Sequence, residues 1–494
     1  MKSSVVQKYT HPILIIVITL CGLFLRLSGT KFGLSYWNDE SHTALFSRGI
    51  LLGGGGAVVD IGTGTGIYQV ALYYTTAISF KLFGTSEFAG RFPSVLAGAI
   101  LILLGYIIIR KILGFKEAII TSFLLAFSQI QLAWSTQLRP YVWLELFTLL
   151  VVYYLYKNIK STDKLIDTNF GLAIVFSLVA TLFHGTGLIS FGIIFFVVIY
   201  KSIKGKRFRF LASVPLFSIV LIVLLYGSYG NLNSVISILL SFRFSPLHYR
   251  IFLTHNYLWL IIGASVGFFA LYKRNRELAL LLGGSIVFIF AIAIFKINPN
   301  YVRYSLPAFP LLYVLFAEGV VSIIDKVSKK EYLRWTLVIF TFMLLSFTGK
   351  FSFRPQYYYS INADVRENPI VDYKLAFAKI QTLIKDKKEV ILMDAWNDRV
   401  PWYLPGQEYI FLTKNGAGKA DPVFGEKMIG TIAEFEVEKK SFPSGVVIVE
   451  DWQSQTPEDL KEHIRKNLKF EFMVQDLPYN ENDHWGISVY SWGI

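Results

Sequence analysis

The stretch PSVLAGAILILLGYIIIR (93–110) indicates the class of fold most directly. Its one charge is its last residue, and its length is close to the ~20 residues with which an α-helix crosses the hydrocarbon core of a bilayer. Apolar stretches of similar length lie at 11–28, 117–136, 139–156, 169–184, 186–200, 210–227, 256–272, 278–295, 305–324 and 334–349. The sequence therefore predicts an α-helical polytopic membrane protein with about 11–13 membrane helices.

The composition of the whole chain agrees with a membrane protein. Of its 494 residues, 54% are hydrophobic and 17% are charged, whereas soluble domains carry roughly 25% charged residues. The one cysteine, Cys21, excludes an intramolecular disulfide and a thiolate metal cluster. The first apolar run carries Arg26 and Leu27 where a signal peptide needs small residues for cleavage. We therefore interpret this run as a retained membrane anchor.

Charge divides the chain near residue 354. Residues 1–354 contain 32 Lys and Arg but 12 Asp and Glu, whereas residues 355–494 contain 16 and 22. Lysines and arginines near the ends of spans stay on the cytoplasmic side of a membrane. Four basic loops mark this side: Lys157, Lys160 and Lys164; Lys201, Lys204, Lys206, Arg207 and Arg209; Lys273, Arg274 and Arg276; and Lys326, Lys329, Lys330 and Arg334. Their alternation with weakly basic loops predicts a multi-pass protein of the cytoplasmic (inner) membrane whose C-terminal part is extracytoplasmic.

The segment IYQVALYYTTAISFKLF (67–83) leaves the count of spans open. It contains Gln69, Lys81 and several hydroxyl groups. If it crosses the membrane, either the loop 29–66 or the C-terminal part lies in the cytoplasm. An interfacial helix, which this polar content permits, keeps both outside.

Residues 355–494 have the pattern of a soluble α/β domain. Helical spacing occurs in VDYKLAFAKIQTLIK (371–385) and in PEDLKEHIRKNL (457–468), the latter opened by Thr456. Apolar strand patterns occur at KEVILMD (388–394), GVVIVED (445–451) and GISVYSW (486–492). We therefore predict a transmembrane domain at 1–354, with an outer loop at 29–66, and an extracytoplasmic α/β domain at 355–494.

Few acids in the first part of the chain are candidates for chemistry, and Asp39 and Glu40 are an adjacent pair among them. They lie in SYWNDESHTALFSRGI (35–50), just after the first span. Two neighbouring carboxylates shift each other's pKa values, or together they bind a divalent cation. Either arrangement serves to activate a hydroxyl nucleophile. The alternative is structural, with Asn38 or Asp39 capping a helix at 41–50. His42 would complete a metal site, although no zinc motif is present.

Two arginines at the predicted outer ends of spans are candidate phosphate ligands. Arg139 lies in QLAWSTQLRPYVW (131–143) and Arg303 in NPNYVRYSLPAFP (298–310). A guanidinium at this depth either anchors the helix at the interface or binds a phosphate with its fork of donors. His184, in a tight turn at the end of a span, is either a structural hydrogen-bonding residue or a ligand.

Four blocks of this sequence together resemble the polytopic glycosyltransferases of the C superfamily, in particular the branch of protein O-mannosyltransferases and lipid A aminoarabinose transferases. The blocks are YWNDESHTALFSRGI (36–50), residues 67–100, WSTQLRPYVW (134–143) and NYVRYSLPAFPLLYVL (300–315). Each block alone is a weak signal, but their order and spacing are fairly specific.

The resemblance implies transfer of a sugar from a polyprenyl-phosphate donor to an extracytoplasmic acceptor, which is a lipid, a glycan or a protein. It implies that Asp39, with Glu40 beside it, is the catalytic base or a ligand of a divalent cation. Arg139 with Tyr141, and Arg303 with Tyr304, fall in the blocks that bind the substrate in this superfamily. Attack on the sugar face opposite the phosphate inverts the anomeric centre, so we expect an inverting enzyme embedded in the lipid bilayer.

A multi-span secondary transporter is the alternative from another class of protein. Transporters usually show internal repeats and ionisable groups near the bilayer midplane. Here Glu145 and Glu318 are the main acids within predicted spans, and a transporter has no need of the domain at 355–494. Nucleic-acid binding is not expected, because the topology of the membrane part explains its basic loops and the C-terminal domain is acidic.

Overall fold

The computed structural model describes most of the chain as two compact units. The described residues are 2–31, 35–53, 69–161, 166–204, 246–295, 302–355, 371–387, 389–414, 418–421, 423–452, 454–475 and 486–494. The first unit comprises Met1–Phe32, Gly64–Ser79 and Phe88–Glu367, and the second comprises Gly33–Thr63, Phe80–Glu87 and Asn368–Ile494. Residues 35–53, which the sequence predicts as part of an outer loop of the transmembrane domain, thus belong to the same unit as the C-terminal domain.

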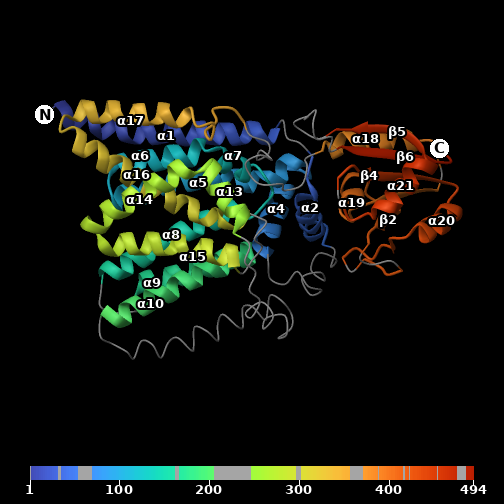
Figure 1. The fold of residues 1–494 in the computed structure, drawn as a ribbon, viewed down its shortest axis with the longest axis horizontal. Coiled ribbons are helices and arrows are strands. Elements are labelled where there is room, and N and C mark those ends of the chain that lie inside the picture. Colours follow the sequence, from blue (N-terminus) through green and yellow to red (C-terminus); the bar gives the residue numbers. More distant parts are fainter. Residues whose placement is uncertain are drawn as a thin grey trace. The chain divides into compact units, whose positions relative to one another are not determined.

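The first unit is helical (Figure 1). Its elements are α1 (Lys2–Lys31), α4 (Val70–Phe83), α5 (Glu87–Ile112), α6 (Phe115–Phe127), α7 (Gln129–Ser135), α8 (Tyr141–Ser161), α9 (Thr168–Phe183), the 3₁₀ helix η2 (Gly185–Leu188), α10 (Ile189–Lys204), α13 (Leu247–Asn256), α14 (Leu258–Arg274), α15 (Arg276–Phe295), the 3₁₀ helix η4 (Val302–Ala308), α16 (Phe309–Val327) and α17 (Glu331–Ser346). The last four residues of α4 and the first residue of α5 belong to the second unit. The predicted class of fold is confirmed.

Fewer of the described helices are long enough to cross a membrane than the predicted 11–13. Six pass by length and apolar character, in α1, α5, α8, η2 with α10, α15, and η4 with α16. A seventh span results if α13 and α14, which meet at 85°, count as one. The other predicted runs are shorter helices or are interrupted, and the run at 210–227 lies outside the described residues.

The predicted span at 117–136 is interrupted at Ser128, where the chain is extended and separates α6 from α7. Residues 350–352 run beside the break: the Gln129 amide donates to the Lys350 carbonyl at 2.9 Å and the Ser352 amide donates to the Phe127 carbonyl at 2.9 Å. Backbone groups in a membrane interior must find partners within the protein. These bonds supply such partners at the break.

Glycines allow α14 and α16 to pack closely. A Cβ atom on Gly267 would lie 1.8 Å from the Leu315 carbonyl oxygen, and one on Gly319 would lie 2.3 Å from the Gly263 carbonyl oxygen. Small residues commonly bring membrane helices together in this way. The contact fixes α16, whose first residue directly follows η4.

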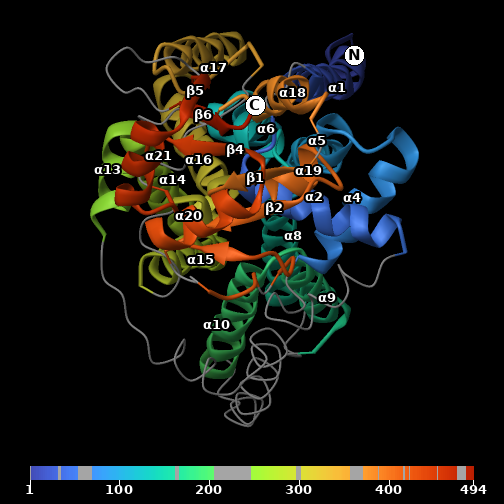
Figure 2. The ribbon, with the colours of Figure 1, turned by 90° about the vertical axis from the view of Figure 1, so that its right-hand side faces the viewer.

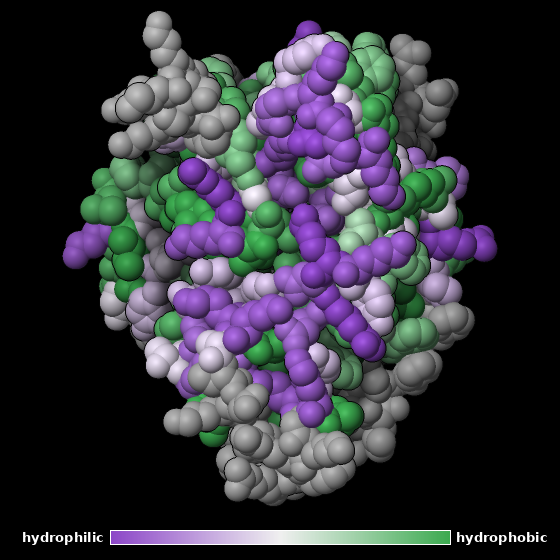
Figure 3. All heavy atoms as spheres, turned by 90° about the vertical axis from the view of Figure 1, so that its left-hand side faces the viewer, coloured by the Kyte–Doolittle hydropathy of each residue, from purple (hydrophilic) through white to green (hydrophobic). Residues whose placement is uncertain are grey.

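Hydrophilic side chains gather at the end of the first unit where α10, α14 and α16 terminate (Figure 3). Many of the charged groups there are paired. The ion pairs include Lys160–Glu277 at 3.0 Å, Arg274–Glu318 at 2.6 Å and Arg334–Asp325 at 3.2 Å. Pairing with the basic loops therefore accounts for Glu277, Glu318 and Asp325.

The second unit contains a mixed six-stranded sheet in the order β3-β2-β1-β4-β6-β5. The strands are β1 (Val390–Asp394), β2 (Tyr409–Leu412), β3 (Met428–Ile429), β4 (Ser444–Glu450), β5 (Lys469–Val474) and β6 (Ile487–Trp492). Strands β1, β2, β3 and β4 are parallel to one another, whereas β6 is antiparallel to its neighbours β4 and β5. The three predicted strands correspond to β1, β4 and β6.

Helices cover both faces of this sheet (Figure 2). Strand β4 is buried along its whole length, and its side chains alternate between two apolar clusters. One cluster includes α18 (Tyr373–Ile384) and α19 (Arg399–Tyr403), and the other includes α20 (Ile432–Ser441) and α21 (Glu458–Asn467). Both predicted helices are present, but α21 follows Pro457 and the side chain of Thr456 does not cap it.

Candidate active site

Arg139 lies in the short connection between α7 and α8. Its amide donates to the Gln137 carbonyl at 2.8 Å, and its own carbonyl accepts a bond from the Ser94 hydroxyl of α5 at 3.2 Å. Pro140 follows, and its carbonyl accepts the first helical bond of α8. The side chain of Arg139 is buried, with its Cζ atom 5.8 Å from the centre of the Tyr141 ring. The turn thus holds the guanidinium against the first residue of α8.

Arg303 reaches the same ring from a distant part of the sequence. It lies in η4 and is also buried. Its Cζ atom is 5.9 Å from the centre of the Tyr141 ring and 5.6 Å from that of the Tyr304 ring. Two guanidinium groups therefore lie near one tyrosine, at distances typical of cation–π contacts.

His184 completes this group of side chains. It joins α9 to η2, and its Nδ1 accepts a bond from the Thr186 amide at 3.2 Å. This bond requires an unprotonated Nδ1, so the ring proton lies on Nε2. The imidazole centre is 6.0 Å from that of Tyr141 and 6.2 Å from that of Tyr304. The turn needs Gly187, because a Cβ there would lie 2.3 Å from the backbone of Ala180.

The structure thus brings together the five residues that the sequence suggested for substrate binding. They come from three separate regions of the first unit, and Tyr141 lies at their centre. The group combines two guanidinium charges, two phenol groups and a neutral imidazole. Guanidinium groups bind phosphate oxygens with paired donors, so the arrangement has the chemistry of a phosphate site. We call these residues the Tyr141 cluster: Arg139, Tyr141, His184, Arg303 and Tyr304.

The sequence patterns did not reveal the role of one buried arginine of the first unit. Arg26 of α1 is buried; its Nε donates to the Ser135 hydroxyl of α7 at 2.7 Å, and its Nη2 donates to the Leu125 carbonyl at 2.8 Å. That carbonyl lies in the last turn of α6, where helical partners are lacking. Arg26 therefore binds α1 to the last turn of α6 and to Ser135 of α7, which is four residues before Arg139. An arginine inside the first apolar run was the available signal.

Asp39 and Glu40 lie in the second unit, in the first turn of α2 (Asn38–Leu51). Trp37 occupies the N-cap position and its side chain makes no capping bond, so neither Asn38 nor Asp39 is the cap. Glu40 is fully buried, whereas Asp39 is partly exposed. Consecutive helix residues point about 100° apart, which follows from 3.6 residues per turn. The two carboxylates therefore have different surroundings, and Asp39 is the more accessible.

A metal site at Asp39 and Glu40 stays a prediction. The described part of the chain contains no group of three His, Cys, Asp or Glu side chains arranged to hold a metal ion. His42 packs against aromatic rings, with its centre 4.5 Å from that of Phe46 and 6.0 Å from that of Phe424.

A buried charge cluster lies at the carboxyl ends of β1 and β4. Arg399 is fully buried; its Nε donates to Asp394 at 3.0 Å and its Nη1 donates to Glu450 at 3.0 Å. Burial raises the pKa of both carboxyl groups, against the opposing effect of Arg399. Burial also raises the pKa of Asp398 to about 7, although it accepts a bond from the Ser41 hydroxyl at 2.8 Å. The sequence patterns did not reveal this cluster.

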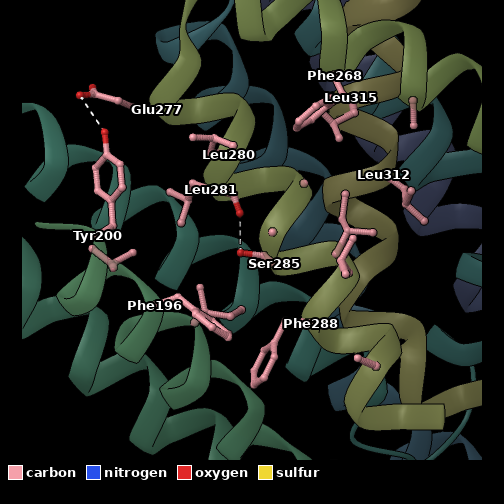
Figure 4. A pocket seen from close by; sticks show the side chains of 18 of the residues that line it. Phe196, Tyr200, Phe268, Glu277, Leu280, Leu281, Ser285, Phe288, Leu312 and Leu315 are labelled. Carbon is pink, nitrogen blue, oxygen red and sulfur yellow. Dashed lines mark hydrogen bonds between the residues drawn. The ribbon is translucent and has the colours of Figure 1, made fainter. Parts of the chain in front are cut away.

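The first unit also contains an apolar cavity of about 820 Å³ (Figure 4). It follows α15 from Glu277 to Ala291 and is lined as well by residues of α10, α14 and α16, among them Phe196, Phe268 and Leu312. Glu277 lies at one end, 3.5 Å from the Tyr200 hydroxyl. The residues of the Tyr141 cluster do not line this cavity.

The architecture is similar to that of solved membrane glycosyltransferases, and the resemblance drawn from the sequence is confirmed. Residues 70–226 match the model of the family dolichyl-phosphate-mannose-protein mannosyltransferase. An uncharacterized protein of Aquifex aeolicus is 26% identical over 303 residues. That match covers 57% of this chain and 58% of the relative, so it spans less than two thirds of the relative's length.

Solved structures share the fold over nearly the whole chain. ArnT from Cupriavidus metallidurans in the apo state superposes with a TM-score of 0.60 at 14% identity, covering 97% of both chains. The same protein bound to undecaprenyl phosphate gives a TM-score of 0.54. The oligosaccharyltransferase of Archaeoglobus fulgidus in the apo form gives 0.55 at 13% identity, covering 90% of this chain and 70% of that one.

Proposed function

We propose that this protein is an integral-membrane glycosyltransferase that moves a sugar from a polyprenyl-phosphate donor to an extracytoplasmic acceptor. The observation that carries the proposal is the Tyr141 cluster, in which Arg139 and Arg303 meet at one ring. The solved ArnT structure with undecaprenyl phosphate supports a donor of this class.

In this proposal Arg139 and Arg303 hold the donor phosphate. Negative charge grows on the phosphate oxygen as its bond to the anomeric carbon breaks, so fixed guanidinium groups stabilise the transition state more than the ground state. Tyr141 and Tyr304 hold both guanidinium groups in place through their ring faces, and His184 offers a neutral Nε2–H donor. These contacts need no metal ion.

Asp39 is proposed as the general base. Its carboxylate takes the proton of the acceptor hydroxyl while the oxygen of that hydroxyl forms a bond to the anomeric carbon. The carbon–oxygen bond to the donor phosphate breaks, and its electron pair remains on the phosphate. One displacement on the face opposite the phosphate inverts the anomeric centre. Glu40, which is fully buried, fits a supporting role in α2 better than direct contact with the acceptor.

The apolar cavity is the proposed site for part of the isoprenoid chain. Its lining follows α15 over 14 residues, about 21 Å at 1.5 Å per residue. Four residues beyond Ala291, α15 ends at Phe295, and η4 with Arg303 is the next described element. A chain that starts from a phosphate at Arg303 would follow this direction. The proposal places the second unit outside the inner membrane, as the charges of the loops predict.

The test is sugar transfer by the purified protein with a labelled polyprenyl-phosphate sugar. Arg139→Gln and Arg303→Gln should each raise the donor KM by about 10–100-fold, the range expected for a charge-assisted hydrogen bond of about 1.5–3 kcal/mol. Arg250→Gln, an exposed arginine of α13 in the same unit, is the matched control. Unchanged donor KM in both variants would remove the arginines from the donor site, and a product with retained configuration would exclude the single displacement.

A further inference from the structure

Helix α2 is built into the C-terminal unit by bonds from several positions along it and from the residues before it. The Ser35 hydroxyl donates to Asp372 at 2.7 Å, and the Tyr36 amide donates to the Tyr403 hydroxyl at 2.8 Å. Farther along, Arg48 donates to a backbone carbonyl of α19 at 2.8 Å. These contacts join residues more than 300 positions apart in the sequence, all within the second unit.

Aromatic packing supports the same contact. The Arg48 guanidinium lies 5.3 Å from the Trp402 ring, and the Tyr36 ring lies 5.1 Å from that ring. Trp402 and Tyr36 are both buried. Trp402 belongs to α19. This short helix therefore contacts the last turn of α2 and the residues that precede α2.

Between these two contacts lies the bond from Ser41 to Asp398. The Ser41 hydroxyl donates to Oδ2 of Asp398 at 2.8 Å, and both side chains are buried. Ser41 is two residues from Asp39 in the first turns of α2. Asp398 precedes Arg399, which is itself bound to the last residues of β1 and β4. The sheet is therefore connected to α2: Arg399 binds the two strand ends, Asp398 is its neighbour in the chain, and Asp398 accepts the bond from Ser41 of α2.

Arg399 and Asp398 lie at a special position of the sheet, the point where the order of its strands reverses. In the order β3-β2-β1-β4, the chain leaves β1 toward one side and returns to its other side, so the carboxyl ends of β1 and β4 form the switch point. Open α/β sheets commonly bind ligands at this crevice. Here Arg399 occupies it, and the residues beside Arg399 hold α2. The sheet uses its usual ligand position to hold a segment of its own chain.

We propose that the C-terminal sheet positions Asp39 for catalysis, through the bond between Ser41 and Asp398 at the switch point. This inference rests on the proposed role of Asp39 as base. Asp398, Ser41 and Trp402 are positioning residues, because they act through α2. The C-terminal unit then contributes to the chemical step itself, besides any part it has in choosing the acceptor.

Kinetics of the full-length protein test the role in catalysis. Asp398→Ala and Ser41→Ala should lower kcat about 10–100-fold with an unchanged donor KM, because a displacement of about 1 Å at a reacting group costs on the order of 10²-fold. Asp398→Asn keeps an oxygen that accepts the Ser41 bond and should retain kcat within about threefold, which is the rescue expected from positioning. Ser441→Ala, which removes a hydroxyl bonded within α20, is the matched control. Equal losses in Asp398→Ala and Asp398→Asn, or unchanged kcat in Ser41→Ala, would overturn the proposal.

A second measurement does not depend on activity. Cys21 is the one cysteine of the chain, so a Cys21→Ser background allows a nitroxide label at Asp39→Cys. Adding Asp398→Ala should give the label a mobile spectral component that Asp398→Asn does not give. If the mobility is the same in all three proteins, the sheet does not position α2. If the mobility changes as expected but the unlabelled wild type transfers no sugar, the positioning stands and the proposed function fails.

Discussion

Replacing Asp398 by asparagine tests the energetic cost of the buried carboxyl group. Burial raises its pKa from 3.8 to about 7, so the folded protein binds this proton more tightly than the unfolded chain does. Between these two pKa values the folded state carries more protons, and stability falls as the pH rises. Above pH 7 the carboxylate is ionised but still buried, so the full free-energy cost of burying its charge lowers the stability of the folded state. The shift of about three pKa units corresponds to about 4 kcal/mol at 1.36 kcal/mol per unit.

Asparagine has the shape of the protonated acid and does not titrate. Asp398→Asn should therefore be as stable as the wild type near pH 4 and more stable at pH 8, by up to about 4 kcal/mol. For a unit of this size the difference in the thermal midpoint is on the order of 10 °C. The buried carboxyl groups of Asp394 and Glu450 are common to both proteins, so the difference between the two isolates Asp398.

The assay is thermal unfolding of the detergent-solubilised protein, followed by tryptophan fluorescence at pH values from 4 to 8. Asp386→Asn makes the same change at an exposed position in the turn after α18 and should leave the pH dependence as in the wild type. A midpoint difference between Asp398→Asn and wild type that is equal at pH 5 and pH 8 would refute the reasoning. So would a variant that is less stable than wild type at pH 8.

Three further substitutions test the packing inside each of the two units. Arg399→Met leaves two buried carboxylates without their partner and should destabilise the second unit by about 3–5 kcal/mol; a thermal midpoint within error of wild type at pH 8 would contradict this. Arg26→Met leaves the Ser135 hydroxyl and the last carbonyls of α6 without this donor, at about 1–3 kcal/mol each, and should lower both the thermal midpoint and donor affinity; an unchanged donor affinity would separate Arg26 from the Tyr141 cluster. Gly267→Ala places a Cβ atom against the Leu315 carbonyl, so α14 and α16 must separate; a folded yield in detergent equal to that of wild type would show that the close packing is not required.

Much of the helical fold was predictable because a membrane imposes its own length on the sequence. The apolar runs at 93–110 and 278–295 correspond closely to α5 and α15. The break at Ser128 was not predictable, because isolated polar residues such as Ser128 and Gln129 also occur inside continuous helices. Its partners at 350–352 lie more than 200 positions away, and a local pattern does not contain that contact.

The second unit likewise contains elements that the sequence predicted and elements that it did not. Its central strands carry continuous apolar runs because both of their faces are buried, so β1 and β4 were recognised. Strand β5 is exposed on much of its length at the edge of the sheet, and it has no such run. The bond from Ser41 to Asp398 spans 357 positions of sequence, so no local pattern predicts it.

Burial separates the arginines that matter here from those explained by membrane topology. The cationic loops account for much of the net charge of +14, and their side chains lie at the ends of helices. Arg26 and Arg399 are instead buried and bonded to carbonyls or carboxylates of the protein, which makes them structural joints. Arg139 and Arg303 are buried against an aromatic ring, although no positive-inside preference places them there. Two buried guanidinium groups at one tyrosine are the feature on which we base the proposal of an anionic substrate.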